Sequence, residues 1–175
     1  EKKNIVTFGS IKEKELDTIY KTIEEIKKRF RDYRICIAPR ELHLTSIIEK
    51  DLSSSFSVTR YSTLRNGADP DAGIVIVDTI GDLLHIYKQS MVAFVGGSLV
   101  PIGGHNLLEP AVLGLPMLSG PHTHNAQDVA ELLQECGALR IVRSMEELAQ
   151  RVGDCFEDPN RARADGALGQ KTVAQ

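Results

Sequence analysis

The sequence is poor in cysteine, in long apolar runs and in excess positive charge, and each shortage excludes a class of protein. Its three cysteines, Cys36, Cys136 and Cys155, lie far apart and show no CxxC spacing. This pattern argues against a structural zinc site or a disulfide framework and favours a reducing compartment. No run reaches the roughly twenty consecutive apolar residues that a membrane-spanning helix needs, and no signal peptide opens the chain.

The charges are mixed in sign and leave no basic footprint. Lysine and arginine number 21 against 24 aspartate and glutamate, for a formal net charge of −3, so binding to nucleic acid is not predicted. One basic cluster lies within 27–34, at the end of a predicted helix, where cations complement the helix dipole. The alternative interpretation of this cluster is a weak contact with anionic lipid.

The length of 175 residues suits one domain with a sizeable core. We expect the main domain over 1–157 and a helical tail over 158–175. The first predicted strand begins almost at the first residue, and no initiator methionine precedes it. We therefore interpret the chain as a fragment of a larger protein, cut at a domain boundary.

Strand and helix patterns alternate along the chain. Short apolar or period-two runs predict strands at 5–8, 34–38, 56–61, 74–77, 91–95, 115–118 and 139–142. Helical spacing and capping patterns predict helices over 13–31, 41–52, 82–89, 106–114 and 126–136, and from Ser144 onward. The stretch 66–73, rich in Gly, Asp and Pro, predicts an exposed, mobile loop. After Pro159 we expect either a last helix or a frayed end.

This alternation predicts an α/β fold, a Rossmann-like, doubly wound parallel sheet with helices on both faces. Ligands of such sheets bind beyond the carboxyl ends of the strands. The loops that follow Phe8, Ala38, Val77, Val95 and Leu118 are therefore the candidate binding loops.

The segment from Phe94 to Asn125, FVGGSLVPIGGHNLLEPAVLGLPMLSGPHTHN, contains the densest set of functional signals. A buried strand, two glycine pairs and the beginning of a helix follow one another in it. In α/β proteins this arrangement holds phosphate, because backbone N–H groups point into the loop and the helix dipole favours an anion. Gly97, Ser98 and Gly104 are the candidate phosphate ligands. The alternative is that the glycines only permit a tight turn.

Asn106 and Glu109 stand three residues apart at the start of the helix predicted over 106–114. One interpretation is a capping box, in which the two side chains satisfy backbone N–H groups of the first turn. The other interpretation is functional, since a carboxylate offers two acceptor oxygens to the two hydroxyl donors of a ribose. In that case Glu109 binds the sugar of a nucleotide.

Two other strand ends carry polar candidates. Arg40 follows Pro39, where its guanidinium suits a paired contact with a phosphate or a sugar carboxylate; the alternative is a solvated side chain. Asp78 follows the strand predicted at 74–77 and is expected to cap the next helix. Asn125 is expected first to cap the helix over 126–136 and second to contact a ligand.

Three histidines, His105, His122 and His124, raise the question of a metal site together with Asp128. An HxH spacing binds zinc only with a third ligand and a supporting second shell. We therefore predict neither a metal nor a cofactor. His105 joins Asn106 among the candidate ligand contacts, and no role is assigned to His122 or His124.

These motifs resemble one family of enzymes. The pattern GGHNxLEPAxxGxP over 103–116, followed by GPHxxN over 120–125, is similar to the C-terminal half of the 3-deoxy-D-manno-octulosonic acid (Kdo) transferases. The segment Val77 to Leu83, VDTIGDL, resembles the family's VDTxGEL. The resemblance runs from about residue 5 to about residue 157 and is strongest over 74–125.

Shorter matches and several departures lie in the first half. Ala38-Pro39-Arg40 resembles the family's xPR strand end, and Gly9-Ser10 its early Gly-Ser turn. After Ser10 the family tends to read THEGEE, where this chain reads IKEKEL over 11–16. After Arg40 the family's histidine is replaced by Glu41, and its RRS reads Arg60-Tyr61-Ser62 here.

The resemblance implies an activity. Kdo transferases are inverting glycosyltransferases of GT-B type, which add Kdo from CMP-Kdo to the lipid A precursor during lipopolysaccharide biosynthesis. They work at the cytoplasmic face of the bacterial inner membrane, and their general base is a carboxylate of an N-terminal domain. The resemblance therefore implies no catalytic residue within 1–175. On this hypothesis 1–157 is the CMP-Kdo-binding domain, inactive alone, with the acceptor, the N-terminal domain and the membrane surface as partners.

The resemblance also implies that the backbone of Ile80 and Gly81 approaches the cytosine. Two alternatives to this family remain open. One is another nucleotide-sugar transferase or epimerase of GT-B architecture. The other is a non-catalytic module that binds a nucleotide without turnover.

Overall fold

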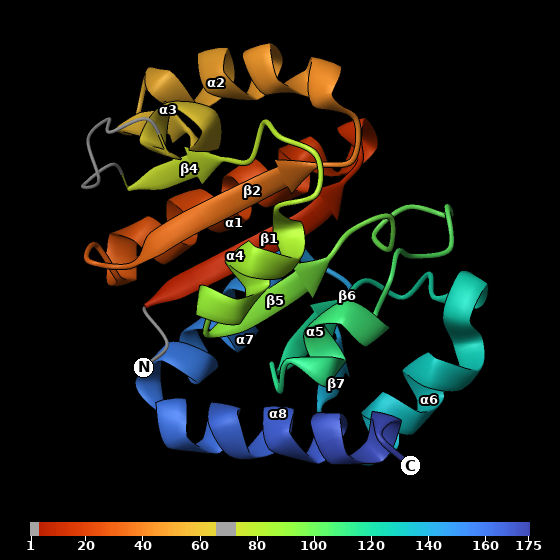
Figure 1. The fold of residues 1–175 in the computed structure, drawn as a ribbon. Helices are drawn as coiled ribbons and strands as arrows, with labels where there is room; N and C mark the ends of the chain where they lie inside the picture. The colour runs from red at the N-terminus through yellow and green to blue at the C-terminus, as the bar shows by residue number, and fades with distance from the viewer. Residues whose placement is uncertain (1–3, 66–72) are drawn as a thin grey trace.

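A parallel sheet runs through the molecule in the computed structural model, which describes residues 4–65 and 73–175 (Figure 1). The strand order is β3-β4-β2-β1-β5-β6-β7, and every neighbouring pair is parallel. The predicted Rossmann-like, doubly wound fold is confirmed. The strands are β1 (Ile5–Ile11), β2 (Arg34–Pro39), β3 (Val58–Arg60), β4 (Ile74–Ile76), β5 (Val92–Val95), β6 (Met117–Ser119) and β7 (Leu139–Ile141).

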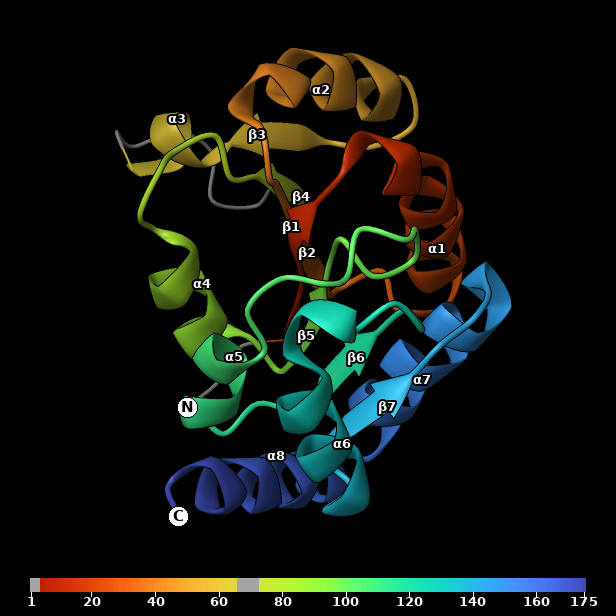
Figure 2. The same ribbon diagram turned by 90° about the vertical axis from the view of Figure 1, so that its right-hand side faces the viewer.

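Helices cover both faces of the sheet. In Figure 2, α4 and α5 lie on one side of the strands, and α1 and α7 lie on the other. Short 3-10 turns precede α1, α2 and α6, at Glu13–Glu15, Leu42–Leu44 and His124–Ala126. The α-helices are α1 (Leu16–Arg29), α2 (Thr45–Ser53), α3 (Tyr61–Arg65), α4 (Leu83–Gln89), α5 (Leu108–Val112), α6 (Gln127–Glu135), α7 (Met145–Glu157) and α8 (Pro159–Val173).

The central strands are apolar along their length because helices bury both of their faces. Phe8 of β1 and Phe94 of β5 are fully buried side by side, with ring centroids 6.1 Å apart. On one face α1 packs against α7, and Ile19 and Ile23 of α1 are buried there, as the amphipathic pattern predicts. This core fixes the strand ends from which the candidate loops begin.

The strand order reverses direction beside β1. On one side of β1 the chain places β2 next to β1, β3 at the edge of the sheet and β4 between β2 and β3. It then crosses back past β1 and continues outward on the other side, through β5, β6 and β7. Loops that diverge at such a reversal leave a crevice beyond the carboxyl ends of the strands.

The first strand is longer than the predicted strand at 5–8. It continues to Ile11, with a register shift between Phe8 and Ile11. Within the shift, Ser10 has a φ of 54°, a left-handed conformation that residues other than glycine rarely adopt. Ser10 lies near the carboxyl end of β1 and is half-buried.

A short helix, α3, replaces the end of the strand predicted at 56–61. Asp78 holds its first turn, because the Asp78 carboxylate accepts hydrogen bonds from the N–H and the hydroxyl of Ser62, at 2.9 and 2.6 Å. The prediction that Asp78 caps the helix after it is therefore wrong. Its partner lies 16 residues earlier in the chain, and a local pattern carries no sign of that contact.

The stretch after Pro159 forms the helix α8, which packs against α5, α6 and α7. A Cβ atom added to Gly166 would lie 2.1 Å from the carbonyl oxygen of Gly114, and one added to Gly169 would lie 2.6 Å from the Cβ of Ala138. The backbone of α8 therefore rests directly on its neighbours, which excludes a frayed end. The loop predicted over 66–73 lies outside the described residues, apart from Gly73.

Ser144 caps α7, as predicted. Its Oγ accepts a hydrogen bond from the N–H of Glu147 at 3.1 Å. We expect Ser144→Ala to lower the free energy of unfolding by about 1 kcal/mol, the usual loss when an N-cap acceptor is removed. Urea unfolding followed by circular dichroism measures the change, with Ser55→Ala, at an exposed serine outside the helices, as the control. Equal stability of Ser144→Ala and wild type would show that the cap contributes nothing.

Candidate functional site

A cleft with two adjoining hollows opens at the carboxyl ends of β1, β2 and β4, where the strand order reverses. Both hollows are lined by Ser10, Arg40, Gly81 and Leu83. One has a volume of about 470 Å³ and is completed by Ala38, Pro39, Leu42, Val77, Thr79 and Ile80. The other has a volume of about 320 Å³ and is completed by Leu84, His105, Asn106 and Glu109.

The smaller hollow brings together residues that were predicted from three separate loops. Arg40 follows β2, Gly81 follows β4, and His105, Asn106 and Glu109 follow β5. Parallel strands direct all these loops to the same edge of the sheet. The result is a cation, a carboxylate and an imidazole around one opening.

Glu109 lies in the first turn of α5 and faces this hollow. The predicted capping box is wrong, because Leu107 holds the N-cap position and no side chain caps it. The Asn106 Oδ1 instead accepts a hydrogen bond from the N–H of Leu108 at 2.8 Å. Within 4–65 and 73–175, the Glu109 carboxylate makes no hydrogen bond to the protein. Its charge is felt by buried Tyr87, whose phenol pKa is raised, first by burial and then by Glu109. The carboxylate is therefore available to a ligand.

The backbone donors of the glycine-rich loop are already engaged inside the protein. The N–H groups of Gly97 and Ser98 donate to the carboxylate of Glu15, at 2.7 and 3.2 Å. The N–H of Gly104 donates to the carbonyl of Gly97 at 2.8 Å. The Ser98 hydroxyl is fully buried, donates to Val95 O at 2.6 Å and accepts from the N–H of Gly120. None of these three residues lines either hollow.

The GPHxxN segment forms hydrogen bonds to the loop that contains the second glycine pair, Gly103 and Gly104. The Asn125 side-chain amide donates to the carbonyl oxygens of Ile102 and Gly104, at 3.0 and 3.1 Å. Gly103 and Gly104 have φ values of 105° and 83°, which glycine adopts without strain. The prediction that Asn125 caps the next helix is wrong, since Thr123 and Ala126 hold the N-cap positions. Asn125 instead shapes the loop that carries His105.

His105 lies with its ring against Gly97. A Cβ atom added to Gly97 would lie 2.6 Å from the His105 Nε2, and Nε2 itself is buried without a hydrogen-bond partner among the described residues. Burial is the largest cause that lowers the pKa of His105, and the positive charge of Arg40 lowers it further. The neutral imidazole is therefore favoured at pH 7.

Two residues that differ from the Kdo transferase pattern contact each other in the structure. Lys12 replaces the family's histidine in the early segment, and Glu41 replaces the histidine after Arg40. Their side chains form an ion pair with an N–O distance of 2.5 Å. The ion pair and the nearby charge of Arg40 hold the pKa of the Glu41 carboxyl below its usual range. One replacement thus supplies the partner of the other.

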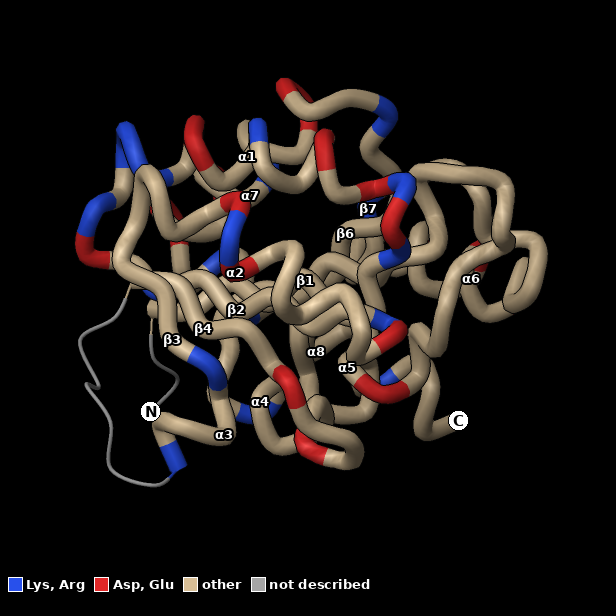
Figure 3. The backbone as a smooth tube through the Cα atoms, turned by 90° about the horizontal axis from the view of Figure 1, so that it is seen from above, with Lys and Arg blue, Asp and Glu red and all other residues tan. Residues whose placement is uncertain are grey.

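The positive charge of the cleft comes from the loops after β1 and β2. Between Lys88 and Asp128 the sequence has one charged residue, Glu109, and Figure 3 shows the long loops beside α6 almost without charge. Lys12 and Arg40 lie on the opposite loops, within the electrostatic range of His105. An anionic ligand in the cleft would therefore meet cations from one side only.

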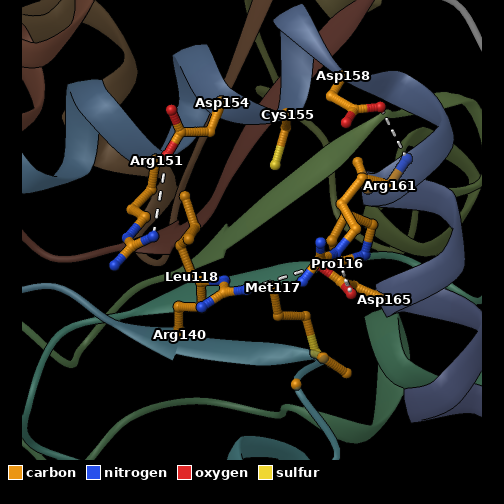
Figure 4. Close-up of a pocket in the computed structure, with 13 residues that line it drawn as sticks. Pro116, Met117, Leu118, Arg140, Arg151, Asp154, Cys155, Asp158, Arg161 and Asp165 are labelled. Atoms are coloured by element: carbon orange, nitrogen blue, oxygen red, sulfur yellow. Dashed lines mark hydrogen bonds and ion pairs between the residues drawn. The ribbon is translucent and has the colours of Figure 1, made fainter.

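A second cavity, of about 220 Å³, lies between β6, β7, α7 and α8 (Figure 4). Its wall includes Pro116 and Ala138, which stand at the amino ends of β6 and β7 and thus away from the usual ligand edge. Most of its charged residues form ion pairs with one another, Arg151 with Asp154 and both Arg140 and Arg161 with Asp165. We therefore assign the candidate site to the cleft.

Neither a metal site nor a membrane span is found in the part of the chain that the structure describes. In 4–65 and 73–175, no three His, Cys, Asp or Glu side chains are grouped so as to hold a metal ion. No helix within these ranges is both long and apolar enough to cross a membrane.

Comparisons with known proteins identify relatives of the chain. No protein-family model matches it. It is 34% identical over 152 residues to the 3-deoxy-D-manno-octulosonic acid transferase of Aquifex aeolicus, a match that covers 86% of the chain and 41% of that relative. It is 35% identical over 136 residues to the enzyme of the same name from Chlamydophila psittaci, covering 77% of the chain and 30% of the relative. The chain thus spans less than half the length of these relatives.

A solved structure agrees with the sequence comparison. The crystal structure of the C-terminal CMP-Kdo binding domain of WaaA from Acinetobacter baumannii matches with a TM-score of 0.90, over 100% of this chain and 91% of that chain. The identity is 24%, so this likeness shows the fold alone. The fold is that of the C-terminal half of a GT-B glycosyltransferase. By its sequence, the chain belongs to the Kdo transferase family.

Proposed function

We propose that this chain is the donor-binding half of an inverting glycosyltransferase that transfers Kdo from CMP-Kdo to the lipid A precursor. The observation that carries the proposal is the convergence of Arg40, His105, Asn106 and Glu109 around one hollow at the carboxyl edge of the sheet. Membership of the Kdo transferase family supports the choice of sugar. The matching Acinetobacter domain is described as binding CMP-Kdo, which supports the choice of nucleotide.

The two hollows suit the two ends of a nucleotide. We assign the ribose to Glu109, whose unpaired carboxylate offers two acceptors to vicinal hydroxyl groups. We assign the cytosine to the larger hollow, beside the backbone of Gly81 and beside Ile80, whose side chain is 87% exposed. An exposed apolar side chain at the mouth of a cleft gains stability when a flat base covers it.

The phosphate and the Kdo carboxylate are assigned to side chains. Arg40 is exposed and lines both hollows, so its guanidinium can reach an anion held between them. His105 and Asn106 line the same hollow from the opposite loop. Gly97, Ser98 and Gly104 contribute indirectly in this proposal, by shaping the loop, because their N–H groups have internal partners.

Inverting transfer needs two functions that this proposal divides between two domains. The donor half stabilises the negative charge that develops on the departing phosphate, and Arg40 is the cation placed for this task. The acceptor hydroxyl must lose a proton to a general base. We assign that base, the contact with the lipid acceptor and the approach to the inner membrane to a further domain of the protein.

Titration with nucleotides tests the proposed donor. We expect the chain to bind CMP more tightly than UMP or AMP in isothermal calorimetry. We expect the same affinity in the presence of EDTA, because a guanidinium already supplies positive charge to the phosphate. Preference for UMP would favour a different nucleotide-sugar enzyme, and equal affinities would favour a general nucleotide-binding module. Loss of CMP binding in EDTA would require a metal in the site.

An activity assay tests the proposed division of labour. The purified chain is expected to show no transfer of Kdo from CMP-Kdo to a lipid acceptor, although it binds CMP. Turnover by the chain alone would show that the general base lies within 1–175 and would overturn the half-enzyme proposal.

A further inference from the structure

A buried carboxylate, Glu15, occupies the position that the glycine-rich loop offers to an anion. It is 1% exposed and lies in the 3-10 turn before α1. Its Oε1 accepts hydrogen bonds from the N–H groups of Gly97 and Lys12, at 2.7 and 2.9 Å. Its Oε2 accepts from the N–H groups of Leu99 and Ser98, at 3.0 and 3.2 Å. Successive N–H groups that converge in this way form an anion-binding nest.

Gly97 connects Glu15 to the candidate site. The carbonyl of Gly97 accepts the N–H of Gly104 at 2.8 Å, and the carbonyl of Gly96 accepts the N–H of His105 at 3.2 Å. The His105 ring then lies on the Gly97 backbone, with no room there for a side chain. Glu15, the loop and the imidazole are therefore in continuous contact.

We infer that Glu15 is a positioning residue of the donor site, because its carboxylate fills the nest of the 97–99 loop and holds Gly97 beneath His105. The inference rests on the proposed function and adds to it a residue that lines neither hollow. It follows that the donor phosphate binds to side chains of the cleft and not to the loop amides. A buried carboxylate is costly unless its oxygens are hydrogen-bonded, and here the loop supplies three of the backbone donors and Lys12 supplies a further one.

The charge of Glu15 also affects the pKa of His105, which can be measured. Three charged groups act on His105: Arg40 after β2 and Lys12 near the end of β1 lower its pKa, whereas Glu15 raises it. Burial also lowers the pKa and is the largest cause. Removal of the Glu15 charge leaves only the lowering causes, so the pKa of His105 should fall further below its ordinary value.

The first experiment is rescue by a small anion. Glu15→Ala leaves the amide donors of 97–99 without an acceptor, in a space that matches a lost carboxylate. We expect its thermal midpoint to fall below that of wild type and to recover as sodium formate is added, with sodium chloride at equal ionic strength recovering less. Wild type should show no such difference between the two salts. Absence of a formate effect in the variant would overturn the nest assignment.

The second experiment uses the isosteric Glu15→Gln, which keeps the volume and carries the test if Glu15→Ala does not fold. NMR titration of the His105 ring should give a lower pKa than in wild type, and CMP affinity should fall about tenfold, the lower end of losses at supporting residues. Glu13→Gln, at an exposed glutamate of the same turn, is the matched control. An unchanged His105 pKa, or unchanged CMP affinity, would overturn the positioning role.

The two proposals fail in different ways. If wild type does not bind CMP, the proposed function fails, while formate rescue and the His105 pKa still decide the role of Glu15. If wild type binds CMP and Glu15→Gln binds it equally well, the proposed function stands and the positioning role fails.

Discussion

Glu109→Ala is expected to weaken CMP binding by about 1.5–3 kcal/mol, the typical loss for hydrogen bonds to a charged group. This corresponds to roughly ten- to a hundredfold in the dissociation constant. The physical reason is that the carboxylate faces the hollow without a protein hydrogen bond among the described residues, so its acceptors are free for the ribose. Isothermal calorimetry with CMP measures the effect.

The ribose assignment makes the loss depend on the ligand. A CMP analogue without the 2′ and 3′ hydroxyls should bind wild type and Glu109→Ala with similar affinity, since neither complex contains the hydrogen bonds. Glu135→Ala, at an exposed glutamate of α6, should bind CMP as wild type does. A full loss for the analogue would place Glu109 on another part of the ligand. A drop in thermal midpoint with unchanged CMP affinity would leave Glu109 with a structural role alone.

Arg40→Ala is expected to weaken CMP binding by roughly 1–3 kcal/mol, the value of a hydrogen bond to a charged group. Arg40 lies just past the carboxyl end of β2 and lines both hollows. Arg40→Lys keeps the charge but loses the planar pair of donors, so it should recover little of the loss. Because cytidine has no phosphate, both variants should bind it nearly as wild type does.

The comparison of the two ligands decides the role of this arginine. Equal losses for CMP and cytidine would move Arg40 from the phosphate to the nucleoside. No loss for either would return it to the solvated surface. Arg31→Ala removes an exposed positive charge before β2 and serves as the control for a general electrostatic effect.

The fold was predictable because its signals are local and repeated. Apolar runs such as that of β5 alternate with amphipathic segments such as α1. Each of these patterns predicts a strand or a helix from its own residues alone. Parallel order and the ligand edge then follow from the alternation. The exceptions are the register shift in β1 around Ser10 and the helix α3 held by Asp78, which no local pattern predicts.

The candidate site was predictable in position more than in detail. Arg40, Gly81 and Glu109 reach one opening, because strand ends of a parallel sheet share an edge. The donors of Gly97 and Ser98 were predicted for phosphate, yet they bind Glu15, which precedes them by 82 and 83 residues. A glycine-rich sequence predicts an anion-binding nest but does not predict which anion occupies it.

One signal for Glu15 was present in the sequence. It follows an exposed glutamate and two lysines, at a position where the family also has an acidic residue in THEGEE. Composition gives no reason to separate it from its charged neighbours. Only its burial, at 1% exposure, and its backbone partners distinguish it.

A map of the CMP site by NMR tests the central claim most directly. On addition of CMP to the ¹⁵N-labelled wild-type chain, the account predicts that the largest shifts belong to Arg40, Gly81, His105 and Asn106, while residues of the cavity between α7 and α8, such as Ala162, stay unmoved. If the largest shifts fell around the α7–α8 cavity, or if CMP in large excess caused no shifts, the assignment of the CMP site to the cleft would be contradicted.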